Sequence, residues 1–115
     1  MTENEKKVYD WLQERPGEGY VWGASGYILT EQKLNELIAQ YPDLVSYKKN
    51  SKWLGKRVWD CAQLVRYAMK EIGISMISGA TSQWKKTNWS QKGTIDTLPK
   101  NKICCLYRQT SDGVM

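Results

Sequence analysis

The chain has 115 residues, 17 of them basic and 12 acidic, and a formal charge of +5. This length favours one domain, and 41% hydrophobic with 25% charged residues is typical of a folded chain rather than a disordered one. These numbers exclude a collagen-like chain, and no apolar run approaches the roughly 18 residues of a membrane span. The N-terminal residues are polar, so we expect no signal peptide.

Two compositional features limit the chemistry. There is no histidine, so no imidazole base or histidine metal ligand can come from these residues. The three cysteines, Cys61, Cys104 and Cys105, are odd in number and two are adjacent, which excludes a disulfide scaffold and predicts free thiols made in a reducing compartment. We therefore expect no metal site and no cofactor.

The chain begins with a predicted helix and a glycine-rich turn. Thr2 and Glu5 have capping-box spacing, and Pro16 ends the helix they open. Four glycines then fall within residues 17–26 around a group of aromatic residues. No apolar strand precedes them and no Lys-Ser/Thr follows, so we interpret this segment as a tight loop that packs aromatic side chains rather than as a phosphate-binding loop.

A second helix is predicted to begin after Thr30 and to end at Pro42. Its apolar residues are spaced to form one face: Leu34, Leu37, Ile38 and Tyr41. Residues 46–57 are polar and basic, and we expect a loop there.

The third helix is the best-specified element. Asp60 is a suitable N-cap and Gln63 takes the reciprocal capping-box position. Gly73 is expected at the left-handed position after the helix, with Ile74 completing a Schellman ending. Cys61 would then be the first helical residue.

Beyond this helix, the sequence predicts a short helix over 81–86, a loop over 94–99 and a buried strand over 103–107. Cys104 and Cys105 would point to opposite faces of that strand and could not bind one metal ion together. The expected total is three or four helices and a single strand. A lone strand has no pairing partner.

Cys61 is the strongest candidate for chemistry. At a helix N-terminus, unpaired backbone N–H groups and the helix dipole favour a thiolate and lie where the oxyanion of an attacked carbonyl would form. The alternative is an inert, half-buried cysteine, which is the commoner fate of a lone thiol.

Three stretches resemble the NlpC/p-sixty family of cell-wall cysteine peptidases. Tyr20-Val21-Trp22-Gly23 is similar to the family's aromatic-glycine motif, and Asp60-Cys61-Ala62-Gln63-Leu64-Val65 resembles its Asp-Cys-Ser-Gly-Leu-Val. Gly73-Ile74, followed by Thr81-Ser82 and Trp84, is similar to the stretch after the nucleophile helix. The insert between the first two motifs resembles the subgroup found in phage and prophage lysins.

The resemblance implies an α+β, papain-like fold and a cysteine endopeptidase that cleaves peptidoglycan stem peptides. Cys61 would be the nucleophile and Asp60 would hold the substrate's free amine, while Tyr20, Trp22 and Ala62 would line the substrate pocket. Two positions depart from the family, because its serine and glycine after the cysteine are Ala62 and Gln63 here.

In the family, a histidine on a following strand is the base. We therefore expect a truncated domain, in which helices dominate and most of the antiparallel sheet is missing, with the histidine just beyond Met115. Residues 1–16 would be an N-terminal helix and residues 17–115 the partial peptidase domain, inactive on its own. The resemblance also implies synthesis in the cytoplasm, release to act at the bacterial cell wall, and affinity of the basic surface for anionic wall polymers.

A second function class is a non-catalytic binding module for stem peptides or nucleic acid. Basic residues at 48–57 and 85–92 lie near four tryptophans, Trp53, Trp59, Trp84 and Trp89, as in single-strand binding surfaces. For nucleic acid we favour the simpler interpretation, in which this segment is solvated and the tryptophans turn inward.

Overall fold

The first two predicted helices are present in the structure, a computed structural model that describes residues 2–89, 91–99, 102 and 104–108. Helix α1 spans Glu3–Gln13, and Thr2 Oγ1 both accepts a hydrogen bond from the Glu5 amide (3.1 Å) and donates one to Glu5 Oε1 (3.0 Å). Helix α2 spans Glu31–Gln40 and begins in the same way, because Thr30 Oγ1 accepts from the Lys33 amide at 3.1 Å. Both caps are confirmed.

Helices α4 (Cys61–Lys70) and α5 (Ala80–Lys86) are also confirmed. After α4, Gly73 adopts a φ of +77°. Its amide donates to the Lys70 carbonyl (3.0 Å) and the Ile74 amide donates to the Met69 carbonyl (3.1 Å). These two bonds are those of the predicted Schellman ending.

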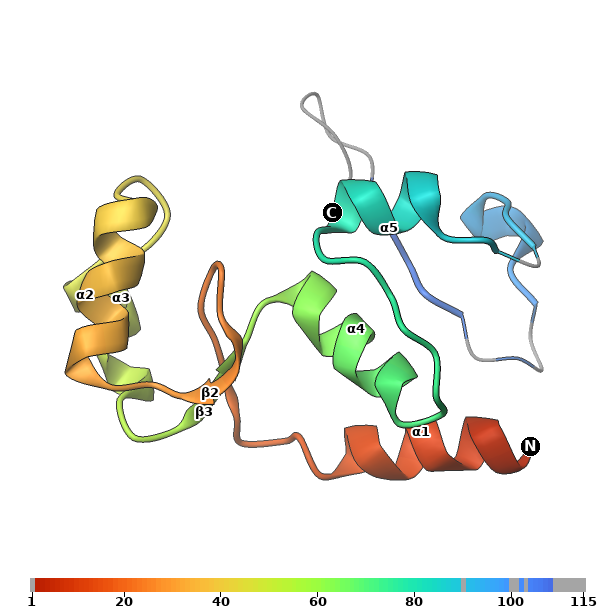
Figure 1. Ribbon diagram of the computed structural model, residues 1–115, viewed down its shortest axis with the longest axis horizontal. Coiled ribbons are helices and arrows are strands. Elements are labelled where there is room, and N and C mark those ends of the chain that lie inside the picture. Colours follow the sequence, from red (N-terminus) through yellow and green to blue (C-terminus); the bar gives the residue numbers. More distant parts are fainter. Residues whose placement is uncertain (1, 90, 100–101, 103, 109–115) are drawn as a thin grey trace. The chain divides into compact units, whose positions relative to one another are not determined.

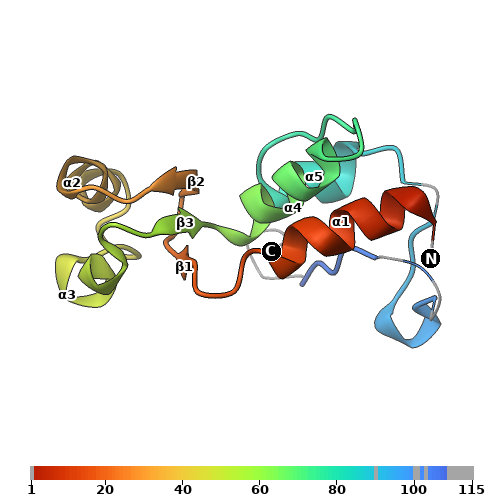
Figure 2. The same ribbon diagram turned by 90° about the horizontal axis from the view of Figure 1, so that it is seen from below.

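The expectation of a single strand is wrong, because three short strands form a mixed sheet. Strands β1 (Gly19–Tyr20), β2 (Ser25–Ile28) and β3 (Arg57–Trp59) lie in the order β1-β3-β2, with β3 between its neighbours in Figure 2. β1 is parallel to β3 and β2 is antiparallel to it. The partners lie about 30 to 40 residues apart in sequence, so no local pattern indicates the pairing.

The expected loop at 46–57 is also wrong. Helix α3 (Tyr47–Asn50) continues into a 3₁₀ turn, η1 (Ser51–Trp53), before β3 begins. Ser46 Oγ accepts from the Lys49 amide at 3.1 Å, and the Ser46 amide donates to Asn50 Oδ1 at 3.1 Å. A helix of one turn that contains two lysines shows no apolar periodicity. The Ser46 cap is the local sequence feature that indicates this helix.

The predicted strand at 103–107 is not found. Residues 104–108 form neither helix nor strand, and Ile103 lies outside the described residues. The expected loop at 94–99 contains a 3₁₀ turn, η2 (Ile95–Thr97). In the described part of the chain there are thus five α-helices and three strands, which makes the fold α+β (Figure 1).

The chain divides into two compact units. The sheet unit is Arg15–Leu64, and the helical unit is Met1–Glu14 with Val65–Met115. In the sheet unit, α2 and α3 lie side by side in both ribbon views. This unit holds the larger core, formed by Val21, Ala24, Leu29, Leu34, Leu37, Val45 and Val58. In the helical unit the buried side chains include Val8, Ala68, Met76 and Gln83.

Glycines in the predicted turn region allow aromatic rings to contact the backbone of the sheet unit. A Cβ atom at Gly23 would lie 2.6 Å from the Tyr41 ring, and one at Gly26 would lie 2.5 Å from the Trp59 ring. At Gly19 it would overlap the Trp53 ring. The packing of aromatic rings expected for this segment is confirmed, but the expected loop is wrong in part, because the segment contains β1 and the start of β2.

Candidate functional site at the start of helix α4

The candidate nucleophile lies where the central strand ends and α4 begins. β3 ends at Trp59, Asp60 follows, and Cys61 is the first residue of α4, as the capping pattern predicts. The Cys61 side chain is exposed. Within the described part of the chain, no acceptor is bonded to the Cys61 amide N–H. The thiol and an available backbone donor therefore belong to the same residue.

Asp60 is fixed in place by backbone groups on both sides of it. Its amide donates to the Ala24 carbonyl at 2.8 Å, and its Oδ1 accepts from the Gln63 amide at 2.7 Å. Burial raises the pKa of Asp60 above its ordinary value of 3.8, and hydrogen bonds from the amides of Gln63, Gly23 and Ala62 offset part of that rise. The carboxylate thus joins the glycine-rich turn to the first turn of α4.

Tyr20 lies beside the same strand end. It pairs with Trp59 in the register of β1 and β3, and its side chain is 46% exposed. Burial raises the pKa of the Tyr20 phenol, and negative charge at Cys61 and Asp60 raises it further. The structure therefore brings together three of the predicted site residues, Tyr20, Asp60 and Cys61.

The two other predicted site residues have packing contacts instead. Trp22 is partly buried and packs against the hydrophobic core of the sheet unit. Ala62 is 8% exposed, so a side chain at this position is turned into the protein. The serine that the resembled family has here would be placed in the interior of this structure.

Sequence reasoning missed the residues that support the site. The Gly23 amide reaches Asp60 across 37 positions of sequence, and no local pattern indicates this contact. Glu18 Oε1 accepts a hydrogen bond at 2.7 Å from the indole Nε1 of Trp59, which is 7% exposed. Arg15 Nη1 lies 3.4 Å from Glu18 Oε2. Glu18 and Trp59 are 41 residues apart, so no local sequence pattern indicates their hydrogen bond.

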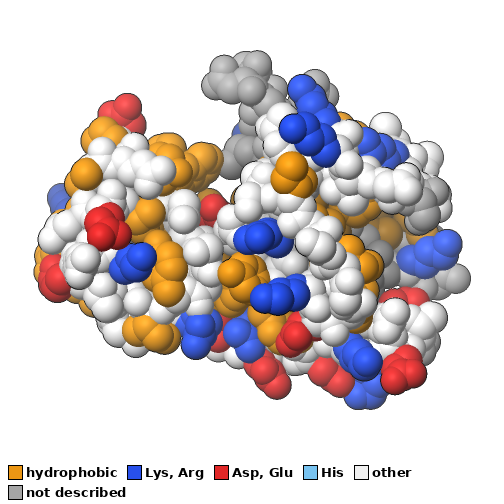
Figure 3. Space-filling view, in the orientation of Figure 1, with side chains coloured by type: hydrophobic (Ala, Val, Ile, Leu, Met, Phe, Trp, Pro, Cys, Tyr) orange, Lys and Arg blue, Asp and Glu red, His pale blue; other side chains and the backbone are white. Residues whose placement is uncertain are grey.

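The basic and aromatic residues of 48–57 contact one another. The ammonium groups of Lys52 and Lys56 lie 5.4 and 5.8 Å from the centre of the Trp53 ring, which also packs against the core. On the face shown in Figure 3, lysine and arginine side chains stand singly or in small groups among acidic and uncharged ones. Trp53 therefore packs inward, as the structural interpretation of this segment expects.

The adjacent cysteines lie in the helical unit. Cys104 is exposed and its thiol lies 3.6 Å from the Lys102 carbonyl, while Cys105 is half-buried. Burial raises the pKa of the Cys105 thiol, as does Cys104, and a hydrogen bond with Tyr107 lowers it in part. Among the described residues, no three histidine, cysteine, aspartate or glutamate side chains lie close enough to hold a metal ion.

Comparisons with protein-family models, curated proteins and solved structures found no match to this chain. The case for a function therefore depends on the geometry at Cys61. In the described part of the chain, none of the helices has both the length and the apolar character that crossing a membrane requires.

Proposed function

We propose that this chain carries the nucleophile half of a peptidoglycan-hydrolysing cysteine endopeptidase, with Cys61 as the attacking thiolate. The observation that carries the proposal is the arrangement at the β3–α4 junction. An exposed thiol begins a helix, a half-buried carboxylate precedes it, and a half-exposed phenol lies beside both. The motif resemblance supplies the substrate class.

The geometry suits acyl transfer. The Cys61 thiolate would attack an amide carbonyl, forming an S–C bond, and the oxyanion would accept a hydrogen bond from the Cys61 amide N–H. Collapse of this intermediate breaks the C–N bond and releases an amine, which must take up a proton. Water then hydrolyses the thioester and regenerates the thiol.

The Asp60 carboxylate and the Tyr20 hydroxyl would bind the substrate. A stem peptide that ends in a free amine carries a positive charge, which the Asp60 carboxylate would pair with at neutral pH. Three backbone amides already orient this carboxylate, so substrate binding would cost little side-chain entropy at Asp60.

The proton transfers need a group from elsewhere. The 115 residues contain no histidine, and a base that activates the thiol and protonates the leaving amine is required for turnover. We propose that this base comes from outside these residues, on a following strand as in the resembled family or on another chain.

The proposal can be tested without a base, because alkylation needs only a thiolate. The probe is a chloromethyl ketone built on L-alanyl-γ-D-glutamate, and its matched control contains L-glutamate. We expect the D-isomer to alkylate Cys61 at least about tenfold faster, equivalent to about 1.4 kcal/mol of recognition. Intact-mass and peptide mass spectrometry would locate the adduct.

Two variants make the result specific. Replacing Cys104 and Cys105 with serine leaves Cys61 as the sole thiol, and this variant should retain the full preference. Asp60→Asn should slow alkylation by both isomers, because both carry the free amine that Asp60 would bind, while alkylation by iodoacetamide, which lacks an amine, is unchanged. Equal rates for the two isomers would overturn the proposal and favour a binding module.

A further inference from the structure

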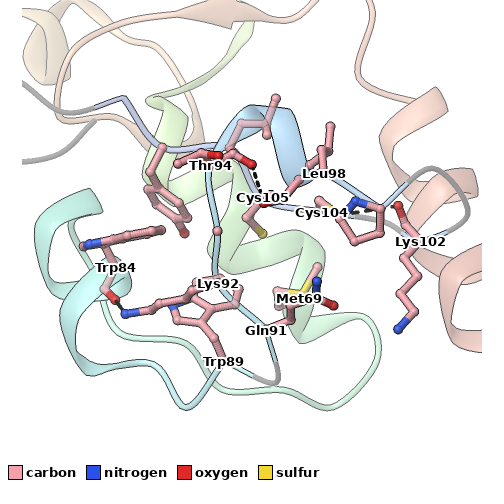
Figure 4. Close-up of a pocket in the computed structure, with 15 residues that line it drawn as sticks. Met69, Trp84, Trp89, Gln91, Lys92, Thr94, Leu98, Lys102, Cys104 and Cys105 are labelled. Atoms are coloured by element: carbon pink, nitrogen blue, oxygen red, sulfur yellow. Dashed lines mark hydrogen bonds between the residues drawn. The ribbon is translucent and has the colours of Figure 1, made fainter.

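A cavity of about 300 Å³ lies in the helical unit, and none of the residues argued above to act with Cys61 lines it. Its described lining comes from α4, from α5 and from the segment that follows α5, and it includes Met69, Trp84, Trp89, Cys105 and Tyr107. Figure 4 shows the Cys105 side chain directed into the space between Trp84, Trp89 and Met69. This volume is at the lower end of small-molecule sites, about 300–1,000 Å³.

A buried glutamine holds the aromatic wall of the cavity. Gln83 is 0% exposed, its side-chain Oε1 accepts from the Tyr107 hydroxyl at 2.8 Å, and its carbonyl accepts from Trp89 Nε1 at 3.1 Å. The centre of the Tyr107 ring lies 5.9 Å from the ring centres of both Trp84 and Trp89. Hydrogen bonds therefore hold the Tyr107 and Trp89 rings, and a tilted ring contact joins Trp84 to Tyr107, before any ligand arrives.

The polar part of the cavity is cationic. Lys92 Nζ donates to the Trp84 carbonyl at 2.6 Å and lies 4.5 Å from the centre of the Trp84 ring, as Figure 4 shows. An ammonium group has three donors, so this contact leaves two for a ligand. Lys102 also lines the cavity, and none of its described lining residues is acidic. The cavity thus combines an apolar, aromatic body with positive charge.

We propose that this cavity binds a small aromatic ring that carries one anionic group, a carboxylate or a phosphate. The ring would lie among Trp89, Met69 and the neighbouring apolar side chains, and the anion would be hydrogen-bonded by Lys92. This proposal is independent of the function proposed for Cys61.

The test is a titration of the ¹⁵N-labelled full chain followed by NMR. The probes are benzoate, phenyl phosphate and neutral benzamide, which has the size and shape of benzoate. We expect benzoate or phenyl phosphate to shift the indole N–H signals of Trp84 and Trp89 saturably, at least about tenfold more tightly than benzamide. Equal affinity for benzamide, or shifts confined to other tryptophans, would overturn the proposal.

Matched lysine variants separate a specific contact from general charge. Lys92→Gln should weaken benzoate binding about five- to tenfold, whereas Lys85→Gln, an exposed α5 position outside the cavity lining, should leave it unchanged. Equal weakening by both variants would mean that net charge, not this cavity, attracts the anion.

Cysteine alkylation supplies a second readout in the unmodified chain. Saturating benzoate should slow the reaction of Cys105 with iodoacetamide, while exposed Cys61 in the other unit serves as an internal reference. An unchanged Cys105 rate would place the probe outside the cavity and contradict the proposal.

Discussion

At the scale of single residues, glycines determine how closely the aromatic rings approach the sheet. Gly19 is buried and its missing Cβ leaves the space that the Trp53 ring occupies. Trp53 packs in turn against the hydrophobic core of the sheet unit. Gly19 does not have a positive φ, so a left-handed backbone does not require glycine here. The contact with the Trp53 ring does.

Gly19→Ala should therefore destabilise the chain by about 1–3 kcal/mol, the usual cost of overpacking. Urea unfolding followed by tryptophan fluorescence would measure it. The control is a double-mutant cycle with Trp53→Leu, in which the smaller side chain makes room and the cost of Gly19→Ala should shrink. Strictly additive effects would show that the two residues do not contact each other.

Asp60 affects stability in two separable ways, through a hydrogen bond and through a half-buried charge. Asp60→Ala removes the cap of α4 and should cost about 1 kcal/mol of unfolding free energy. Asp60→Asn keeps an oxygen acceptor and should lower the unfolding free energy by only about a few tenths of a kcal/mol. Urea titrations of the two variants at neutral pH test this difference, and equal losses would contradict it.

The charge of Asp60 should also make stability depend on pH. Its folded-state pKa lies above 3.8, so the folded chain binds this proton more tightly than the unfolded chain does. The stabilisation is therefore fully present below pH 3.8 and is lost as pH rises through the folded-state pKa. Measured against Asp60→Asn, the wild-type chain should lose unfolding free energy over this range, and a gain would contradict the raised pKa.

At the scale of secondary-structure elements, the four longer helices were predictable, whereas the one-turn helix α3 and the strands were not. The caps at Thr2, Thr30 and Asp60 are contacts between residues three apart, so the sequence contains them in full. β1 has two residues and β3 has three, and both are defined by pairing with distant strands, since β1 pairs with β3 and β3 also pairs with β2. A local pattern of so few residues carries no strand signal.

The ending of α4 offers a test of an element boundary. Gly73→Ala should lower the unfolding free energy by about 1–2 kcal/mol, because φ is +77° there and a Cβ is disfavoured in that region. No other atom lies within 4 Å of the added Cβ, so the cost is conformational alone. Gly73→Asn should cost less, since asparagine tolerates this region. Chemical denaturation measures both variants, and an unchanged stability in Gly73→Ala would contradict the Schellman ending.

At the scale of the whole molecule, the sequence predicted the position of the candidate nucleophile but not its surroundings. Cys61 at the start of α4 follows from the cap that precedes it. The Gly23 contact with Asp60 and the pairing of Tyr20 with Trp59 depend on how distant segments meet. The cavity beside Gln83 escaped prediction for the same reason, because its walls come from α4, from α5 and from the segment after α5, whose described part has only the 3₁₀ turn η2 as regular structure.

The completeness of the catalytic machinery can be tested on the whole chain. Residues 1–115 should release no new amino groups from purified peptidoglycan above a Cys61→Ala control. Without a histidine, no imidazole of these residues can protonate the leaving amine, and general acid–base catalysis alone accounts for about 10²–10⁴-fold in rate. Digestion of the same substrate by an unrelated peptidoglycan amidase would establish that its amides are accessible. Cys61-dependent release by the 115 residues alone would mean that a group other than imidazole supplies the proton, and Asp60, the carboxyl group next to Cys61 in the chain, would be the residue to substitute next.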